Sequence, residues 1–146
     1  MERLLLTLDD DALTAFTLDL PEERCTLLAD PALLHQALLL LLQNALDAAA
    51  TVTLRVRVDR ERGRAVFHVW NPGALALDGG AERAFDPFVT TKPDALGLGL
   101  WMARRIAEAH DGGLHLVSHD AEAGTGFALE IPLPPEATLY ASGAPC

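Results

Sequence analysis

The sequence has few basic residues and only two cysteines. Its 146 residues contain 11 Lys and Arg against 21 Asp and Glu, a net charge of −10. Such an acidic chain is a poor partner for nucleic acid or for an anionic membrane surface. Cys25 and Cys146 make no metal-ligand spacing, and we expect no structural disulfide, which suits a reducing, cytoplasmic setting.

Long apolar runs and targeting signals are also missing. The longest apolar stretch, residues 37–42, is far shorter than the roughly 20 residues that a membrane span needs. Residues 1–11 reach three aspartates without a cleavage pattern, so we expect neither a signal peptide nor direct membrane contact. There is no internal repeat with a period of about 20 to 50 residues.

The composition predicts a folded domain. Hydrophobic residues make up 50% of the chain, charged residues 22%, and the mean hydropathy is +0.19. A chain of this size buries roughly two-thirds of its unfolded surface, and it fits one domain better than two. We place that domain at residues 1–135 and expect residues 136–146 to form a flexible tail.

Hydrophobic periodicity predicts an α+β fold. Asp30 is a predicted N-cap with Pro31 at the first helical position, and the helix runs to about residue 50. A second helix is expected over residues 99–110, and a long ordered loop with one helical turn near Ala81 precedes it. The predicted strands cover residues 15–20, 26–28, 51–59, 65–70, 114–118 and 126–133. We expect a two-layer sandwich: a mixed, mostly antiparallel sheet with the helices on one face.

Asn44 and Asp47 lie three residues apart near the end of the first predicted helix, so both are on one face of it. A lone asparagine at such a position often caps a neighbouring loop. A binding role for Asn44 therefore depends on partners elsewhere in the chain.

Two further segments offer anion-binding groups. Residues 85–93 hold the only lysine, Lys92, beside Thr90 and Thr91; together they supply a mobile positive charge and two hydroxyls, although an ordinary solvated lysine is the simpler reading. Residues 97–100 (GLGL) lead into the second helix, where backbone N–H groups and the helix dipole favour an anion. These glycines also suit close packing, and the P-loop and dinucleotide motifs are absent.

Two turns adjoin predicted strand ends. Asn71-Pro72-Gly73 closes one strand and Gly124-Thr125-Gly126 opens another. Each can place a side-chain acceptor or hydroxyl beside tight backbone, and each alone is commonly only a turn.

The order of these segments resembles the N, G1, F, G2 and G3 boxes of the histidine-kinase ATP-binding domain, a member of the Bergerat-type ATPase superfamily. The resemblance covers about residues 30–134, and its most specific part is residues 85–113, FDPFVTTKPDALGLGLWMARRIAEAHDGG. This stretch is similar to sensor kinases with a short ATP lid.

The resemblance implies ATP and Mg²⁺ as ligands. It makes Asn44 the Mg²⁺ ligand, puts Asn71 where the family usually has an adenine-reading aspartate, and gives Thr125 a supporting place at the adenine end. Lys92 and the backbone at residues 98–100 would hold the phosphates, with Asn44 and Lys92 as the catalytic residues. The expected nucleotide site comprises Asn44, Asp47, Asn71, Gly73, Thr90, Thr91, Lys92, Gly97, Leu98, Gly99, Leu100 and Thr125.

Four positions depart from the family pattern. Asn71 lacks the charge of the usual aspartate, so we expect weaker adenine affinity. Leu40 stands where the family commonly has a polar residue, which removes a general base. Ala95 and Leu75 replace usual glycines, so the hinges of the lid are expected to be stiffer.

None of the five histidines has the setting of a phosphate acceptor; they are His35, His68, His110, His115 and His119. His110 is expected to pack or hydrogen-bond near the end of its helix, and Trp70 and Trp101 to pack beside the sheet or mark a docking surface. The resemblance therefore implies a sensor-kinase catalytic domain, cytoplasmic and monomeric in isolation, with an acceptor histidine on a separate dimerisation domain and a response regulator downstream.

Two alternatives remain. A degenerate ATP-binding module would signal by nucleotide-dependent docking without phosphotransfer, as the replacements Leu40, Asn71 and Ala95 suggest. A serine kinase of the anti-sigma-factor type on the same fold fits less well, because that group differs in its lid and has an acidic residue at the place of Leu40.

Overall fold

The computed structural model describes residues 16–75, 77, 80–90 and 97–135. Its elements, in chain order, are β1 (Phe16–Asp19), α3 (Pro31–Ala48), β2 (Val52–Asp59), β3 (Arg64–Asn71), the 3-10 helix η1 (Ala81–Arg83), α4 (Gly99–Ala109), β4 (Gly113–Asp120) and β5 (Gly124–Pro132). The predicted tail, residues 136–146, lies outside the described residues.

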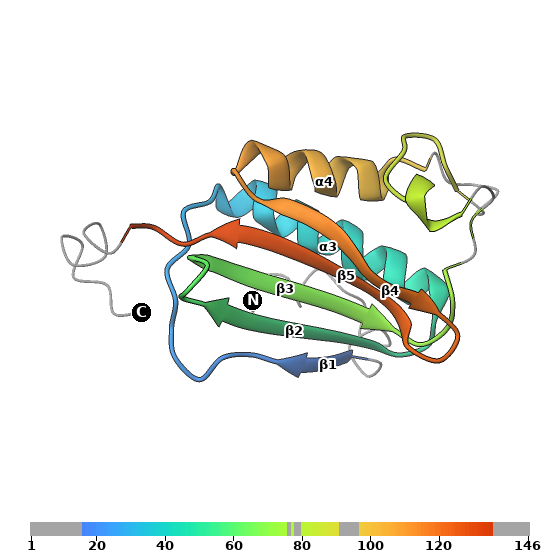
Figure 1. The fold of residues 1–146 in the computed structure, drawn as a ribbon, viewed down its shortest axis with the longest axis horizontal. Helices are drawn as coiled ribbons and strands as arrows, with labels where there is room; N and C mark the ends of the chain where they lie inside the picture. The colour runs from blue at the N-terminus through green and yellow to red at the C-terminus, as the bar shows by residue number, and fades with distance from the viewer. Residues whose placement is uncertain (1–15, 76, 78–79, 91–96, 136–146) are drawn as a thin grey trace.

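The five strands form one sheet in the order β1-β2-β3-β5-β4. β1 pairs with β2 in parallel, and the other three neighbouring pairs are antiparallel. Figure 1 shows α3 and α4 side by side over one face of this sheet. The predicted two-layer sandwich with a mixed, mostly antiparallel sheet is therefore confirmed.

One predicted strand was wrong. Residues 26–28 form no strand; β1 instead pairs with β2, with Phe16 opposite Val52 and Leu18 opposite Leu54. The eight-residue β2 offers a longer partner than a three-residue segment, and adding to it extends a sheet whose inner face is already buried. Leu28 remains 62% exposed.

The start of α3 follows from its sequence. Asp30 Oδ1 accepts hydrogen bonds from the backbone N–H groups of Ala32 (2.9 Å) and Leu33 (3.1 Å), and Pro31 follows the cap. These bonds satisfy two of the otherwise unpaired amides of the first turn. Every third or fourth side chain of the helix then faces the sheet: Ala37, Leu38, Leu41, Leu42 and Ala45 are buried.

The core fills the space between the two helices and the sheet. Its largest fully buried side chains are Phe127, Leu41, Leu42, Leu54, Leu129, Ile131, Val52 and Val69. His110 joins the end of α4 to the start of α3, because its Nε2 accepts from the Asp30 N–H at 3.0 Å while its Nδ1 lies 2.7 Å from the Ile106 carbonyl oxygen. The predicted hydrogen bonding of His110 is thus confirmed.

None of the helices in the described part of the chain has the length and hydropathy that crossing a membrane would require.

Candidate functional site

The ends of four elements meet at one end of the sandwich. Figure 1 shows that α3 and β3 end there, while α4 and β5 begin there. These ends carry Asn44, Asn71, Gly99 and Thr125, which are far apart in the sequence. The fold therefore brings four of the five predicted box segments to one place, and the fifth, residues 85–90, precedes α4 along the chain.

Asn71 and Thr125 are the two buried polar side chains in the described ranges, each 3% exposed. They are directly opposite each other in the β3–β5 register. Asn71 Nδ2 donates to the Pro72 carbonyl at 2.9 Å, and Thr125 Oγ1 donates to the Gly73 carbonyl at 2.9 Å. The two side chains therefore form an uncharged polar surface, and their hydrogen bonds also stabilise the turn after β3.

The turn that follows Asn71 is exposed. Gly73 has φ +94°, and a Cβ built on it would meet no atom within 4 Å. Buried polar side chains beside an exposed turn are candidates for ligand contact, because a ligand can complete hydrogen bonds that the core does not offer.

Asn44 lies on α3, partly buried, one turn after Leu40. Leu40 Cδ2 is 3.8 Å from the place of a Cβ on Gly99, so Leu40 packs against the first residue of α4. Residues four apart share a helix face, and Asn44 therefore lies on the α3 face that Leu40 turns toward α4. Asp47 is exposed, and its Oδ1 accepts from Gln43 Nε2 at 3.3 Å.

The amino end of α4 differs from that of α3. Leu98 at the N-cap gives no side-chain hydrogen bond, and no acidic residue occupies the first turn. The backbone N–H groups of the first turn, at Gly99 and Leu100, therefore lack the side-chain cap that Asp30 provides for α3. With the helix dipole, such amides favour a phosphate-like anion.

Phe88 and Gly97 are joined on either side of the loop that carries Lys92, which we call the lid. The Phe88 N–H donates to the Gly97 carbonyl at 3.0 Å, and Gly97 has φ +69°. A Cβ on Gly97 would lie 2.7 Å from both Phe88 C and Val89 N, so only glycine fits. Thr90 is exposed, while the predicted site residues Thr91 and Lys92, and Ala95, lie outside the described residues.

The two phenylalanines of the FDPF segment have different environments. The Phe85 ring packs edge-on against Phe127, with centroids 5.9 Å apart. Phe88 is 72% exposed and has φ +66°, a left-handed conformation that is costly for a bulky residue. Sequence reasoning missed this strained, exposed aromatic, because no local pattern predicts its left-handed backbone or its close contact with Gly97.

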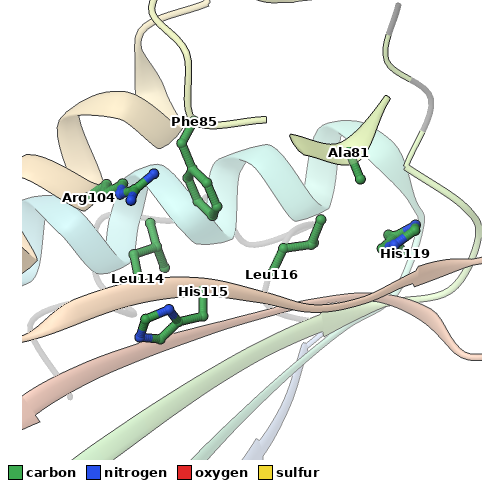
Figure 2. Close-up of a pocket in the computed structure, with 7 residues that line it drawn as sticks. All are labelled: Ala81, Phe85, Arg104, Leu114, His115, Leu116 and His119. Carbon is green, nitrogen blue, oxygen red and sulfur yellow. The ribbon is translucent and has the colours of Figure 1, made fainter. Parts of the chain in front are cut away.

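A pocket of about 350 Å³ lies between the η1–Phe85 segment, α4 and the edge strand β4, and Figure 2 shows the side chains that line it. It is lined by Ala81, Phe85, Arg104, Leu114, His115, Leu116 and His119, none of which is a predicted site residue. The Arg104 guanidinium lies 5.1 Å from the Phe85 ring centroid, and its Nε is 3.2 Å from Glu108 Oε1. The Arg104 guanidinium is therefore already paired and is not an uncommitted cation for an anion.

The clearest pKa shifts of acidic and imidazole groups lie away from the candidate site. Asp19 lies beside Arg57 (2.7 Å) and Arg55 (2.8 Å), whose hydrogen bonds hold the pKa of its carboxyl below the usual range. Burial, with repulsion from Arg55, lowers the pKa of His68. Arg55, Arg57 and His68 alternate with the buried positions of β2 and β3, so they belong to the helix-free face. Asp19 is on the same face because it is the register partner of Arg55.

Comparison with known proteins identifies the class. The sequence model of the family described as "Histidine kinase-, DNA gyrase B-, and HSP90-like ATPase" matches residues 29–135. This range contains all four converging ends. The chain belongs to this ATPase family, and it corresponds to the catalytic domain of two-component sensor histidine kinases.

Two curated relatives show where such domains occur. The chain is 36% identical over 115 residues to the C4-dicarboxylate transport sensor protein DctS of Rhodobacter capsulatus, covering 74% of this chain and 17% of DctS. It is 31% identical over 145 residues to the histidine-protein kinase AtoS of Escherichia coli K12, covering 91% of this chain and 22% of AtoS. The chain thus spans about a fifth of these relatives.

Solved structures agree with the fold. The nucleotide-free catalytic domain of the histidine kinase ThkA superposes with a TM-score of 0.73 at 28% identity, covering 92% of this chain and 91% of that one. Full-length ShkA in complex with AMPPNP superposes with a TM-score of 0.70 at 26% identity, covering 90% of this chain and 29% of ShkA.

Proposed function

We propose that this chain binds Mg·ATP at the end of the sandwich where α3, β3, α4 and β5 meet, and that it supplies the catalytic domain of a longer sensor kinase. The observation that carries the proposal is the convergence there of a buried polar pair, an uncapped helix N-terminus and an amide side chain. These three features suit the base, the phosphates and the metal of a nucleotide, respectively.

Each residue then has a distinct task. Asn71 and Thr125 receive the adenine, the amides at Gly99 and Leu100 hold the phosphates, and Lys92 adds a positive charge from the lid. Asn44 offers an amide oxygen, a hard donor that fits Mg²⁺ when phosphate and water oxygens complete its coordination. The ion, when bound, neutralises charge on the phosphates. Asp47, Gly73, Thr90, Thr91, Gly97 and Leu98 complete the proposed site.

Phosphoryl transfer requires little covalent chemistry from this chain. A nitrogen of the acceptor histidine forms a bond to the γ-phosphorus while the bond from that phosphorus to the bridging oxygen breaks and ADP leaves. Positioning and charge stabilisation dominate such transfers, and the apolar Leu40 packed against Gly99 leaves no general base at that place. In this proposal the nucleophile is a histidine of a dimerisation domain outside this chain, and a response regulator receives the phosphoryl group later.

A second candidate function rests on the same Leu40 and on Asn71. In a degenerate module, nucleotide binding would change docking to a partner and no phosphate would move. The domain would then bind ATP and leave every partner unlabelled.

The test supplies γ-labelled ATP and Mg²⁺ to this chain together with a dimerisation domain that bears an acceptor histidine. Acid-labile label on that domain, lost when its histidine is replaced, is expected for a histidine kinase. Acid-stable label on a partner would indicate a serine kinase. Retained ATP binding without label would favour the docking module.

A further inference from the structure

The base-contacting end of the proposed site is uncharged, and this affects which bases it can bind. Asn71 and Thr125 are each 3% exposed and face each other across β3 and β5. Where the family usually has an acceptor-only aspartate, this chain has an amide with a donor and an acceptor at opposite ends.

In the structure, the Asn71 amide has one orientation. Its Nδ2 donates to the Pro72 carbonyl at 2.9 Å, which turns Oδ1 away from that carbonyl. In this orientation Oδ1, an acceptor, is the end of the amide that is left to meet the 6-amino group of adenine. The amide orientation in the structure is therefore the one that suits the adenine base of ATP.

Turning the amide over reverses this preference. Nδ2 then faces the ligand and donates to the 6-oxo oxygen of hypoxanthine or guanine. The neutral bond to Pro72 is lost, and the side chain must also rotate enough to keep Oδ1 away from the Pro72 carbonyl oxygen. Losing one such bond corresponds to about a three- to tenfold change in affinity. An aspartate at this position has no donor to present, whichever way it turns.

We propose that Asn71 gives this pocket dual base specificity, so that 6-oxopurine nucleoside triphosphates bind alongside ATP. This inference rests on the nucleotide binding proposed above. Thr125 Oγ1 is already committed as a donor to the Gly73 carbonyl at 2.9 Å, so its oxygen lone pairs remain to accept the N1–H that 6-oxopurines carry and adenine lacks.

The experiment measures the dissociation constants of ATP, ITP and GTP for the wild-type chain with Mg²⁺ by calorimetry. ITP is the main probe because it differs from ATP only at the 6-position and N1, whereas GTP adds a 2-amino group. We expect ITP to bind within about tenfold of ATP. ITP binding more than about a hundredfold weaker than ATP would overturn the inference while leaving the proposed function intact.

Variants assign the effect to the residue. Asn71→Asp is expected to weaken ITP by a further factor of at least about ten relative to ATP, because its carboxylate faces the 6-oxo oxygen. Gln36→Glu makes the same charge change at an exposed position of α3 and is expected to leave the ITP-to-ATP ratio unchanged. An unchanged ratio in a folded Asn71→Asp protein would contradict the role of Asn71. Absence of binding by ATP itself, in folded wild-type chain, would overturn the proposed function and this inference with it.

Discussion

Replacing Gly97 by alanine tests how the base of the lid is built. Gly97 has φ +69°, and its added Cβ would lie 2.7 Å from Phe88 C, 2.7 Å from Val89 N and 2.8 Å from Val89 C. An L-residue in this left-handed region costs about 1–2 kcal/mol, and overpacking against backbone costs about 1–3 kcal/mol more. The total is therefore at least about 2 kcal/mol, equivalent to about a 30-fold change in an equilibrium constant.

The alanine relieves this strain with the smallest loss of free energy if residue 97 moves away from residues 88–89, because only one backbone hydrogen bond joins these segments. The core stays packed, since Gly97 is not among the core residues. We expect ATP affinity by calorimetry to fall about 30-fold, while the melting temperature falls by no more than about 3 °C.

Gly63→Ala is the matched control. Gly63 also has a left-handed φ, +63°, but its added Cβ meets no atom within 4 Å, and it lies in the β2–β3 hairpin. It should lower stability and leave ATP affinity unchanged. Gly97→Ala affinity within twofold of wild type, or an equal loss of affinity in Gly63→Ala, would refute this description of the lid base.

Three further predictions concern stability. Asp30→Ala removes two capping bonds from α3 and should lower the free energy of unfolding by about 1 kcal/mol in a urea titration, whereas Asp30→Asn should retain most of it. Phe127 is 1% exposed and packs against Phe85, so Phe127→Ala leaves a cavity and should lower the free energy of unfolding by about 3–5 kcal/mol in the same titration. A loss below about 1 kcal/mol would show that the Phe127 ring is not packed as described. The pKa of His68 is lowered from its ordinary 6.5 by burial and by Arg55, so the unfolded chain binds the proton more tightly. Stability should therefore fall as the pH drops below about 6.5 towards the folded pKa, and His68→Gln should remove part of that loss. An NMR titration that placed the pKa of His68 at or above 6.5 would contradict this.

Local signals predicted most of the fold. The Asp30-Pro31 start of α3 and the alternation of buried residues in the hairpin act over a few residues, so they are visible in the sequence. The pairing of β1 with β2 crosses α3, and no local pattern reveals it. That is why the position of β1 in the sheet was not predicted, and residues 26–28 were mistaken for a strand.

The candidate site was less accessible to local reasoning. Asn71 and Thr125 are more than fifty positions apart in the chain, and only the β3–β5 register places them opposite each other. Their association was predicted through the family resemblance, because the residue spacing alone indicates nothing more than a turn at each position. The exposure of Phe88 and the stacking of Arg104 over Phe85 depend on tertiary contacts that no motif encodes.

The most direct test is an ATP titration of the purified chain by calorimetry, with and without Mg²⁺, beside Asn44→Ala and the control Gln36→Ala on the same helix. We predict binding that requires Mg²⁺, is lost or weakened at least about tenfold in Asn44→Ala, and is unchanged in Gln36→Ala. Absence of ATP binding by the folded chain, or Mg²⁺-dependent binding that Asn44→Ala leaves intact, would contradict the proposed site.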